Sequence, residues 1–300
     1  MKFRFEVDGQ NSGRTVGSIL KNEFRFSRSL IRKFKYHGIV HCNSMPVHMN
    51  HILKEGDVVE ADISFEETSE GVRPVPMDLC ILFEDESLIA LDKPAGIIIH
   101  PIGANSDNTI ANGLMHYFRS KGEMIKVRPV GRLDRDTTGI IVFAKNEFIQ
   151  HKLIEQMKMK EYHKEYTGIT HGCPKEKSGT IDLPIARTPG SIILREISDS
   201  GAPSVTHYSV QEYMNNASVV RFVLETGRTH QIRVHCKAIG HPLIGDTLYS
   251  DYPTDLIARQ ALHSHYVRFT HPISGKAIEL ASTLPPDMVR LREYLKADFT

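Results

Sequence analysis

The first 63 residues carry a pattern of apolar and polar positions that predicts two short helices followed by strands. The apolar positions of the first helix recur at helical spacing, at Val16, Ile19, Leu20 and Phe24. Ser27 is a favourable N-cap for the second helix. This helix has an apolar face and a separate basic stripe, formed by Arg28, Arg32 and Lys35. Apolar segments at 39–42 and 53–59 then predict strands joined by a turn.

The pattern changes twice after this first unit. Residues 64–77 lack periodicity and gather acids, glycine and two prolines, which predicts a linker. From Leu79 onward, strands are predicted over 79–83, 88–92, 139–144, 163–170, 204–212, 218–225 and 261–269, and helices over 109–118, 146–158, 229–239 and 286–296. Because strands outnumber helices and short turns join most of them, we expect an α+β fold over 78–300, with a mixed, largely antiparallel β-sheet and flanking helices. The unit over 1–63 is expected to be a small α/β domain.

Composition limits the classes of protein that fit this pattern. The chain has 300 residues, 40% of them hydrophobic and 24% charged, which is typical of a globular protein. Its net charge of +1 gives no global basic field, so any nucleic-acid site must come from local clustering. The four cysteines form no close pair, which predicts reduced thiols and no zinc site. With neither a secretory signal nor a membrane-length apolar run, we expect a cytoplasmic protein without membrane contact.

The segment ‘GRLDRDTTG’ at 131–139 places a carboxylate in a basic and apolar setting. Asp134 lies between Arg132 and Arg135, and an apolar strand follows the segment. Nearby cations favour the charged form of a carboxylate, so Asp134 is a candidate nucleophile or base. On this segment alone, a turn or N-cap role is the simpler explanation of an aspartate. We assign Asp136 such a structural role.

Three further segments carry candidate chemistry. In ‘HKEYTGITHG’ at 163–172, Tyr166 lies on a strand face where its ring can stack on a base or pack as an ordinary strand residue. In ‘LETGRTHQIRVHCKAIGHPLIGD’ at 224–246, three side chains cluster at a helix N-terminus that can hold a phosphate or a carboxylate: Arg228, His230 and Arg233. The third, ‘LDKPAGIIIHP’ at 91–101, fits a turn that leaves Lys93 exposed. The histidine spacings do not suit a metal.

In this order, the motifs resemble the RluA family of pseudouridine synthases over roughly 78–281. ‘GRLDRDTTG’ is similar to the family's RLD signature, ‘TGRTHQIRVH’ is the more specific match, and ‘RQALHSHYVRFTHPISG’ at 259–275 matches a further family segment. One difference is Gly131, where many members have histidine before RLD. Residues 12–62 resemble the small RNA-binding domain named after ribosomal protein S-four.

The resemblance implies an isomerase that detaches uracil from its ribose in RNA and rejoins it through ring carbon 5. It implies that Asp134 is the catalytic carboxylate, acting on the sugar or on the base, and that Arg233 pairs with it. Tyr166 would stack on the uracil, and Arg132 would fill the gap left by the flipped nucleotide. Other RNA contacts are expected from Arg228, His230 and the basic stripe of the second helix. No cofactor or metal is implied, and we expect a monomer.

Large-subunit ribosomal RNA is the first substrate to test, and transfer RNA is the second. Two other functions stay open from the residues. A catalytically silent RNA-binding or ribosome-assembly factor could keep the fold, although it would be expected to lose at least one of the three catalytic candidates. A carboxylate-dependent glycosidase would need a second acidic residue beside Asp134, and the motifs supply none.

Overall fold

The computed structural model describes residues 1–36, 40–64, 71–101 and 107–297. The N-terminal unit contains two helices and a four-stranded sheet in the order β1-β4-β2-β3. Its elements are β1 (Lys2–Glu6), α1 (Val16–Asn22), α2 (Arg28–Tyr36), β2 (Val40–Cys42), β3 (Met45–Val47) and β4 (Val58–Asp62). Ser27 caps α2 as expected, because its Oγ accepts a hydrogen bond from the Leu30 N–H at 3.1 Å. The strand predicted over 53–59 begins later, at Val58, because Leu53 is a buried residue of the preceding loop.

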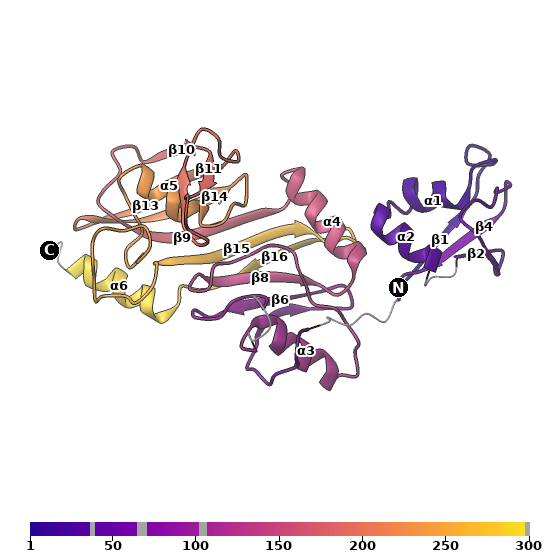
Figure 1. Ribbon diagram of the computed structural model, residues 1–300, viewed down its shortest axis with the longest axis horizontal. Helices are drawn as coiled ribbons and strands as arrows, with labels where there is room; N and C mark the ends of the chain where they lie inside the picture. The colour runs from indigo at the N-terminus through magenta and orange to yellow at the C-terminus, as the bar shows by residue number, and fades with distance from the viewer. Residues whose placement is uncertain (37–39, 65–70, 102–106, 298–300) are drawn as a thin grey trace.

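A large sheet is the main element of the rest of the molecule, and helices flank it. This arrangement confirms the expected α+β class (Figure 1). Its main path runs β10-β13-β14-β9-β15-β8-β6-β5, and every strand pair in the sheet is antiparallel among the described residues except β15 with β8. The predicted strands are β5 (Cys80–Glu84), β6 (Leu88–Lys93), β8 (Thr138–Ala144), β9 (His163–His171), β13 (Val205–Met214), β14 (Ala217–Leu224) and β15 (Leu262–Thr270).

Beyond the N-terminal unit, five short strands were not expected from the sequence. These are β7 (Arg128–Pro129), β10 (Ser178–Asp182), β11 (Ile185–Arg187), β12 (Arg195–Ile197) and β16 (Ala277–Ala281). They are two to five residues long and mostly half-exposed, so each has too few apolar positions to show a period of two. β11 and β12 pair with each other as a separate hairpin.

Four helices flank the large sheet, close to the ranges that the sequence predicts. They are α3 (Ile110–Ser120), α4 (Glu147–Lys158), α5 (Gln231–Ala238) and α6 (Pro286–Ala297). Thr109 and Asn146 cap α3 and α4 with side-chain hydrogen bonds, which fixes where these helices begin. Across the described part of the chain, none of the helices combines the length and the apolar character needed to cross a membrane.

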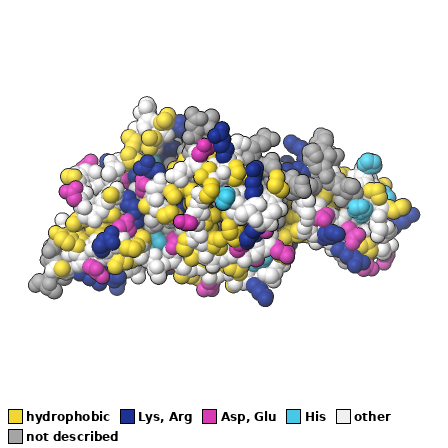
Figure 2. Space-filling view, turned by 90° about the horizontal axis from the view of Figure 1, so that it is seen from below, with side chains coloured by type: hydrophobic (Ala, Val, Ile, Leu, Met, Phe, Trp, Pro, Cys, Tyr) yellow, Lys and Arg dark blue, Asp and Glu magenta, His cyan; other side chains and the backbone are white. Residues whose placement is uncertain are grey.

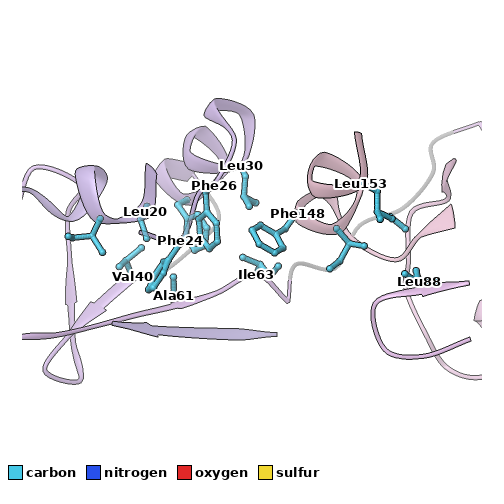
Figure 3. Close-up of a cluster of buried hydrophobic side chains, with 14 of the residues drawn as sticks. Leu20, Phe24, Phe26, Leu30, Val40, Ala61, Ile63, Leu88, Phe148 and Leu153 are labelled. Carbon is cyan, nitrogen blue, oxygen red and sulfur yellow. The ribbon is translucent and has the colours of Figure 1, made fainter. Parts of the chain in front are cut away.

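The N-terminal unit packs against α4 of the large unit (Figures 1 and 3). Phe148, in the first turn of α4, is 4% exposed, and its ring centroid lies 4.9 Å from that of Phe3 and 5.6 Å from that of Phe26. Beside this aromatic contact, the Lys33 ammonium lies 2.5 Å from the Glu147 carboxylate. The two cores are therefore continuous through an apolar contact with an ion pair at its edge.

Candidate active site

Six of the residues singled out in the sequence line one narrow pocket of about 50 Å³. They are Arg132, Asp134, Tyr166, Arg228, His230 and Arg233. The pocket opens where the segment before β8, strand β9, the start of β15 and the N-terminus of α5 meet. Arg28 and Arg32 lie elsewhere, exposed on α2 of the N-terminal unit, and the side chain of Lys35 falls outside the described residues.

The segment that carries Asp134 is held in place by its two ends. The Thr137 N–H donates to the Asp134 carbonyl at 3.2 Å, which closes a tight turn. Gly139 then has φ of +107°, and a Cβ built there would lie 2.2 Å from the Ser264 carbonyl oxygen. Only glycine allows β8 to approach β15 this closely. Gly131, at the other end, has room for a side chain, since a Cβ there would meet only Met157 Cε at 3.7 Å.

Lys93 contacts the same segment through its side chain, and the prediction that this lysine is exposed was wrong. Its side chain is 1% exposed, and Nζ donates to the carbonyls of Arg135 at 2.8 Å, Pro94 at 2.7 Å and Ile97 at 3.0 Å. Burial lowers the pKa of Lys93 to about 8, although the charges of Asp136 and Asp134 oppose this. The ‘LDKPAG’ turn therefore ties strand β6 to the Asp134 segment.

Arg233 makes its strongest contacts with a residue to which the sequence assigned no role. Its Nε and Nη2 donate to the two carboxylate oxygens of Asp246, both at 2.7 Å, and only Nη1 reaches Asp134 Oδ2, at 3.4 Å. Burial opposes the charge of Arg233, but the hydrogen bonds and charge of Asp246 outweigh it and raise the pKa of the guanidinium. Asp134 is thus the outer member of a charged group: its side chain is 26% exposed, against 5% for Arg233 and 1% for Asp246.

Tyr166 and Arg132 form other parts of the pocket wall. Tyr166 is 6% exposed on β9, opposite Phe222 of β14 and Ser264 of β15. Its ring is therefore held by the sheet while it lines the pocket. Arg132 is exposed, and its Nη2 donates to Thr229 Oγ1 at 2.9 Å. This hydrogen bond joins the Asp134 segment to the segment before α5.

His230 occupies the N-cap of α5 in the left-handed conformation, with φ of 59° and ψ of 19°. Its Nε2 lies 3.9 Å from Asp134 Oδ1, and its Nδ1 lies 2.8 Å from the Tyr249 hydroxyl. Burial lowers the pKa of His230 despite the opposing charge of Asp134, which favours the neutral imidazole. The sequence analysis assigned no role to Tyr249 or to Asp246, because nothing in the pattern indicates that residues 246–249 contact the pocket residues.

One group of residues has side-chain atoms close enough together to share a metal ion, within the part of the chain that the structure describes. Cys42, His51 and Asp57 lie in the N-terminal unit, away from the pocket. The Asp57 carboxylate already accepts hydrogen bonds from the Lys54 N–H at 2.7 Å and from Asn43 Nδ2 at 2.8 Å. Burial and the charge of Asp57 raise the pKa of the Cys42 thiol, so this group favours the neutral thiol over the thiolate that binds metals.

Curated relatives match this chain over most of its length. The chain is 39% identical over 287 residues to a Bacillus subtilis protein named uncharacterized RNA pseudouridine synthase YhcT, covering 95% of this chain and 94% of that protein. It is 37% identical over 257 residues to ribosomal large subunit pseudouridine synthase D of Escherichia coli, covering 81% of this chain and 78% of that protein.

Solved structures and a family model agree with these relatives. Human RNA pseudouridylate synthase domain containing 1 matches 70% of this chain and 86% of its own, with a TM-score of 0.58 and 26% identity. Human RNA pseudouridylate synthase domain containing 4 shares the fold, with a TM-score of 0.59, 24% identity, and coverage of 72% of this chain and 92% of that one. The model of the RNA pseudouridylate synthase family matches residues 87–238, which contain all six of the predicted residues that line the pocket. The chain therefore belongs to the RNA pseudouridylate synthase family of RNA isomerases.

Proposed function

We propose that this enzyme converts specific uridines of large-subunit ribosomal RNA to pseudouridine, with Asp134 as the catalytic carboxylate. The observation that carries the site assignment is the convergence of Asp134, Arg233 and Tyr166 on one pocket, from segments far apart in the chain. The substrate assignment draws support from the relative named for the ribosomal large subunit.

The pocket offers the groups that this isomerisation needs. Breaking the bond between uracil and ribose develops positive charge on the sugar, which a fixed carboxylate such as Asp134 can stabilise or capture. Arg233 holds that carboxylate from one side, and the Tyr166 ring supplies a flat apolar wall on which uracil can stack. Exclusion of water from this pocket would keep the detached base from being lost.

A flipped nucleotide also requires contacts outside the pocket. We propose that Arg132 leaves Thr229 and takes the position vacated by the uridine, while Arg228 and His230 lie against the flanking RNA. We also propose that the enzyme acts as a monomer. A mass measurement of the complex with RNA tests this point.

The N-terminal unit is proposed as an S-four-type RNA-binding domain over residues 1–63, joined through 64–77 to a catalytic domain over 78–300. Its exposed Arg28 and Arg32 follow one side of α2, in a position to contact phosphates. The face of the molecule in Figure 2 intersperses Lys and Arg with acidic and apolar side chains. Local basic groups such as this stripe, and not a uniform field, are therefore proposed to bind RNA.

Release of tritium from carbon 5 of labelled uridine in RNA tests the activity directly. We expect release from ribosomal RNA with the wild-type protein, and no release with Asp134→Asn, whose RNA affinity should stay within a few-fold. Asp136→Asn is the matched control, since it removes the same charge two residues away on the same segment and should retain turnover. Turnover by Asp134→Asn would show that the carboxylate is misassigned, and release from transfer RNA alone would move the substrate to that class.

The RNA-binding role of the N-terminal unit has a separate test. Replacing Arg28, Arg32 and Lys35 together by alanine should weaken RNA binding and reduce its dependence on salt concentration. Lys2 and Arg4, exposed on β1 of the same unit, provide a control pair for loss of charge. An unchanged salt slope in the triple variant would assign the stripe to solubility.

A further inference from the structure

Tyr249 is a buried residue that contacts two of the pocket residues, His230 and Arg233. Its position suggests a role in the site. It is 4% exposed, and the Arg233 guanidinium lies over its ring, 5.0 Å from the centroid. Its hydroxyl meets two groups from other segments: the backbone N–H of Arg195 at 2.9 Å and Nδ1 of His230 at 2.8 Å. Tyr249 does not itself line the pocket that holds Asp134.

These two hydrogen bonds determine which group donates and which accepts between Tyr249 and His230. A backbone N–H can only donate, so the Arg195 N–H donates to the Tyr249 oxygen. The single phenolic proton of Tyr249 is then free to point at His230 Nδ1, which accepts it through its lone pair. A neutral imidazole that accepts at Nδ1 carries its own proton on Nε2. That Nε2 faces Asp134 Oδ1 at 3.9 Å.

The opposite tautomer is disfavoured by the same geometry. With its proton on Nδ1, His230 would direct the Nε2 lone pair at the Asp134 carboxylate, and two acceptors would face each other. The phenolic proton of Tyr249 would also lose its acceptor. A doubly protonated ring is disfavoured because burial lowers the pKa of His230. The Nε2–H form is therefore the one that satisfies all three residues.

The backbone conformation of His230 is an independent indication of a functional role. It adopts a left-handed conformation that non-glycine residues rarely occupy, yet its side chain makes no capping hydrogen bond. The turn is instead closed by Gln231, whose Oε1 accepts from the Arg228 N–H at 3.0 Å. The strained conformation directs the His230 ring between Tyr249 and Asp134, and strain of this kind is concentrated at functional sites.

We propose that Tyr249 and His230 act as a positioning pair, in which Tyr249 fixes the His230 tautomer and the Nε2–H of His230 orients the Asp134 carboxylate. With Arg233 Nη1 at 3.4 Å from Oδ2 and His230 Nε2 at 3.9 Å from Oδ1, each oxygen of Asp134 faces a nitrogen on its protein side. The distance of 3.9 Å is longer than a hydrogen bond, and such contacts often shorten only when substrate is bound. The effect on turnover rests on the proposed function of Asp134, whereas the tautomer does not.

The tautomer can be measured without turnover, by nitrogen NMR of protein labelled at histidine. The His230 signals are assigned by their loss in His230→Ala. We expect an unprotonated Nδ1 and a protonated Nε2 at neutral pH in the wild-type protein, and a mixture of tautomers in Tyr249→Phe. A protonated Nδ1 in the wild-type protein would overturn the proposal.

Turnover then tests the role of the pair. Tyr249→Phe should lower kcat by about ten-fold with little change in KM, because a positioned donor affects the transition state more than binding. His230→Gln, whose amide can place an N–H near the Nε2 position, should be about ten-fold more active than His230→Ala or His230→Asn. Equal activity of the three His230 variants would overturn the role of the donor.

Tyr252→Phe is the control for loss of a tyrosine hydroxyl on the same loop. Tyr252 also contacts a histidine, with 4.8 Å between its ring centroid and that of His171, but it is 57% exposed and lies outside the pocket. The kcat of the Tyr252→Phe variant should match that of the wild-type protein. If the wild-type protein releases no tritium from any RNA, the proposed function fails, while the NMR result still decides the tautomer.

Discussion

The bidentate pair of Arg233 and Asp246 gives the sharpest test of how the pocket is built. Asp246→Asn keeps the size of the side chain but removes its charge. One amide oxygen remains for the contacts that Asp246 Oδ1 now makes with the Leu248 N–H at 3.0 Å and the Tyr249 N–H at 3.2 Å. The new amide group then faces the Arg233 guanidinium, so a donor replaces an acceptor at 2.7 Å.

The size of the effect follows from burial. Asp246 and Arg233 are 1% and 5% exposed, so the substitution leaves a buried cation with a distant partner. Breaking such a pair costs about 3–5 kcal/mol of unfolding free energy. The contact between Arg233 Nη1 and Asp134 Oδ2 is already 3.4 Å long, and loss of its support should misplace it further. A displacement of about 1 Å in an active site can lower kcat by about 100-fold.

Urea unfolding and single-turnover tritium release measure the two effects separately. Asp287→Asn is the matched control, because Asp287 forms the same bidentate pair with Arg259, at 2.7 and 2.9 Å. Its carboxylate is 32% exposed, so its loss should cost only about 1 kcal/mol. If Asp246→Asn costs no more than this control, or keeps wild-type kcat while folded, the account of the Arg233 pair is wrong.

Three further predictions concern Lys93, His235 and Phe148. Lys93→Met leaves three carbonyls without their donor and should cost about 3 kcal/mol near neutral pH. The folded pKa of Lys93 is about 8, below its unfolded value of 10.5, so the unfolded chain binds more protons between these two pH values. Urea unfolding of the wild-type protein should therefore show stability from this group increasing as pH rises from 8 to 10.5. The Lys93→Met variant should lack that increase. Burial lowers the pKa of His235, so wild-type stability should fall as pH drops below 6.5, and a His235→Gln variant should show a shallower fall. Phe148→Ala should loosen the contact between the two units and raise hydrogen exchange in residues 1–63; unchanged exchange there would mean that Phe148 is not what holds the units together.

The parts of the fold that follow from the sequence are those with a long, regular apolar pattern. Strand β8 is buried at every position, so it is visible as an apolar segment. The helices are marked by N-caps as well as by periodicity. The β11–β12 hairpin was missed because strands of three residues with half-buried side chains carry too little of either signal.

The candidate site divides in the same way. Asp134, Tyr166 and Arg233 became site candidates through the resemblance to the RluA family, because the residue pattern alone left a structural role open for Asp134 and Tyr166. Asp246 and Tyr249 were missed because their importance depends on where the chain returns after α5, which local patterns do not specify. Lys93 was missed for a related reason: a lysine in a turn is expected to be exposed, and only the tertiary structure supplies the three carbonyls that make its burial favourable.

The arrangement of charges around Arg233 suits the catalytic role that we propose for Asp134. If Arg233 bound Asp134 through two short hydrogen bonds, the pair would neutralise itself and the carboxylate would be a poor partner for a developing positive charge. The short bidentate contact is made instead with Asp246, which is buried and does not line the pocket. Asp134 is contacted only by Nη1 of Arg233, at 3.4 Å, and its side chain stays partly exposed. Under the proposed mechanism, Asp246 therefore balances the buried cation, and Asp134 is held in position while its charge remains available to the ribose or the base.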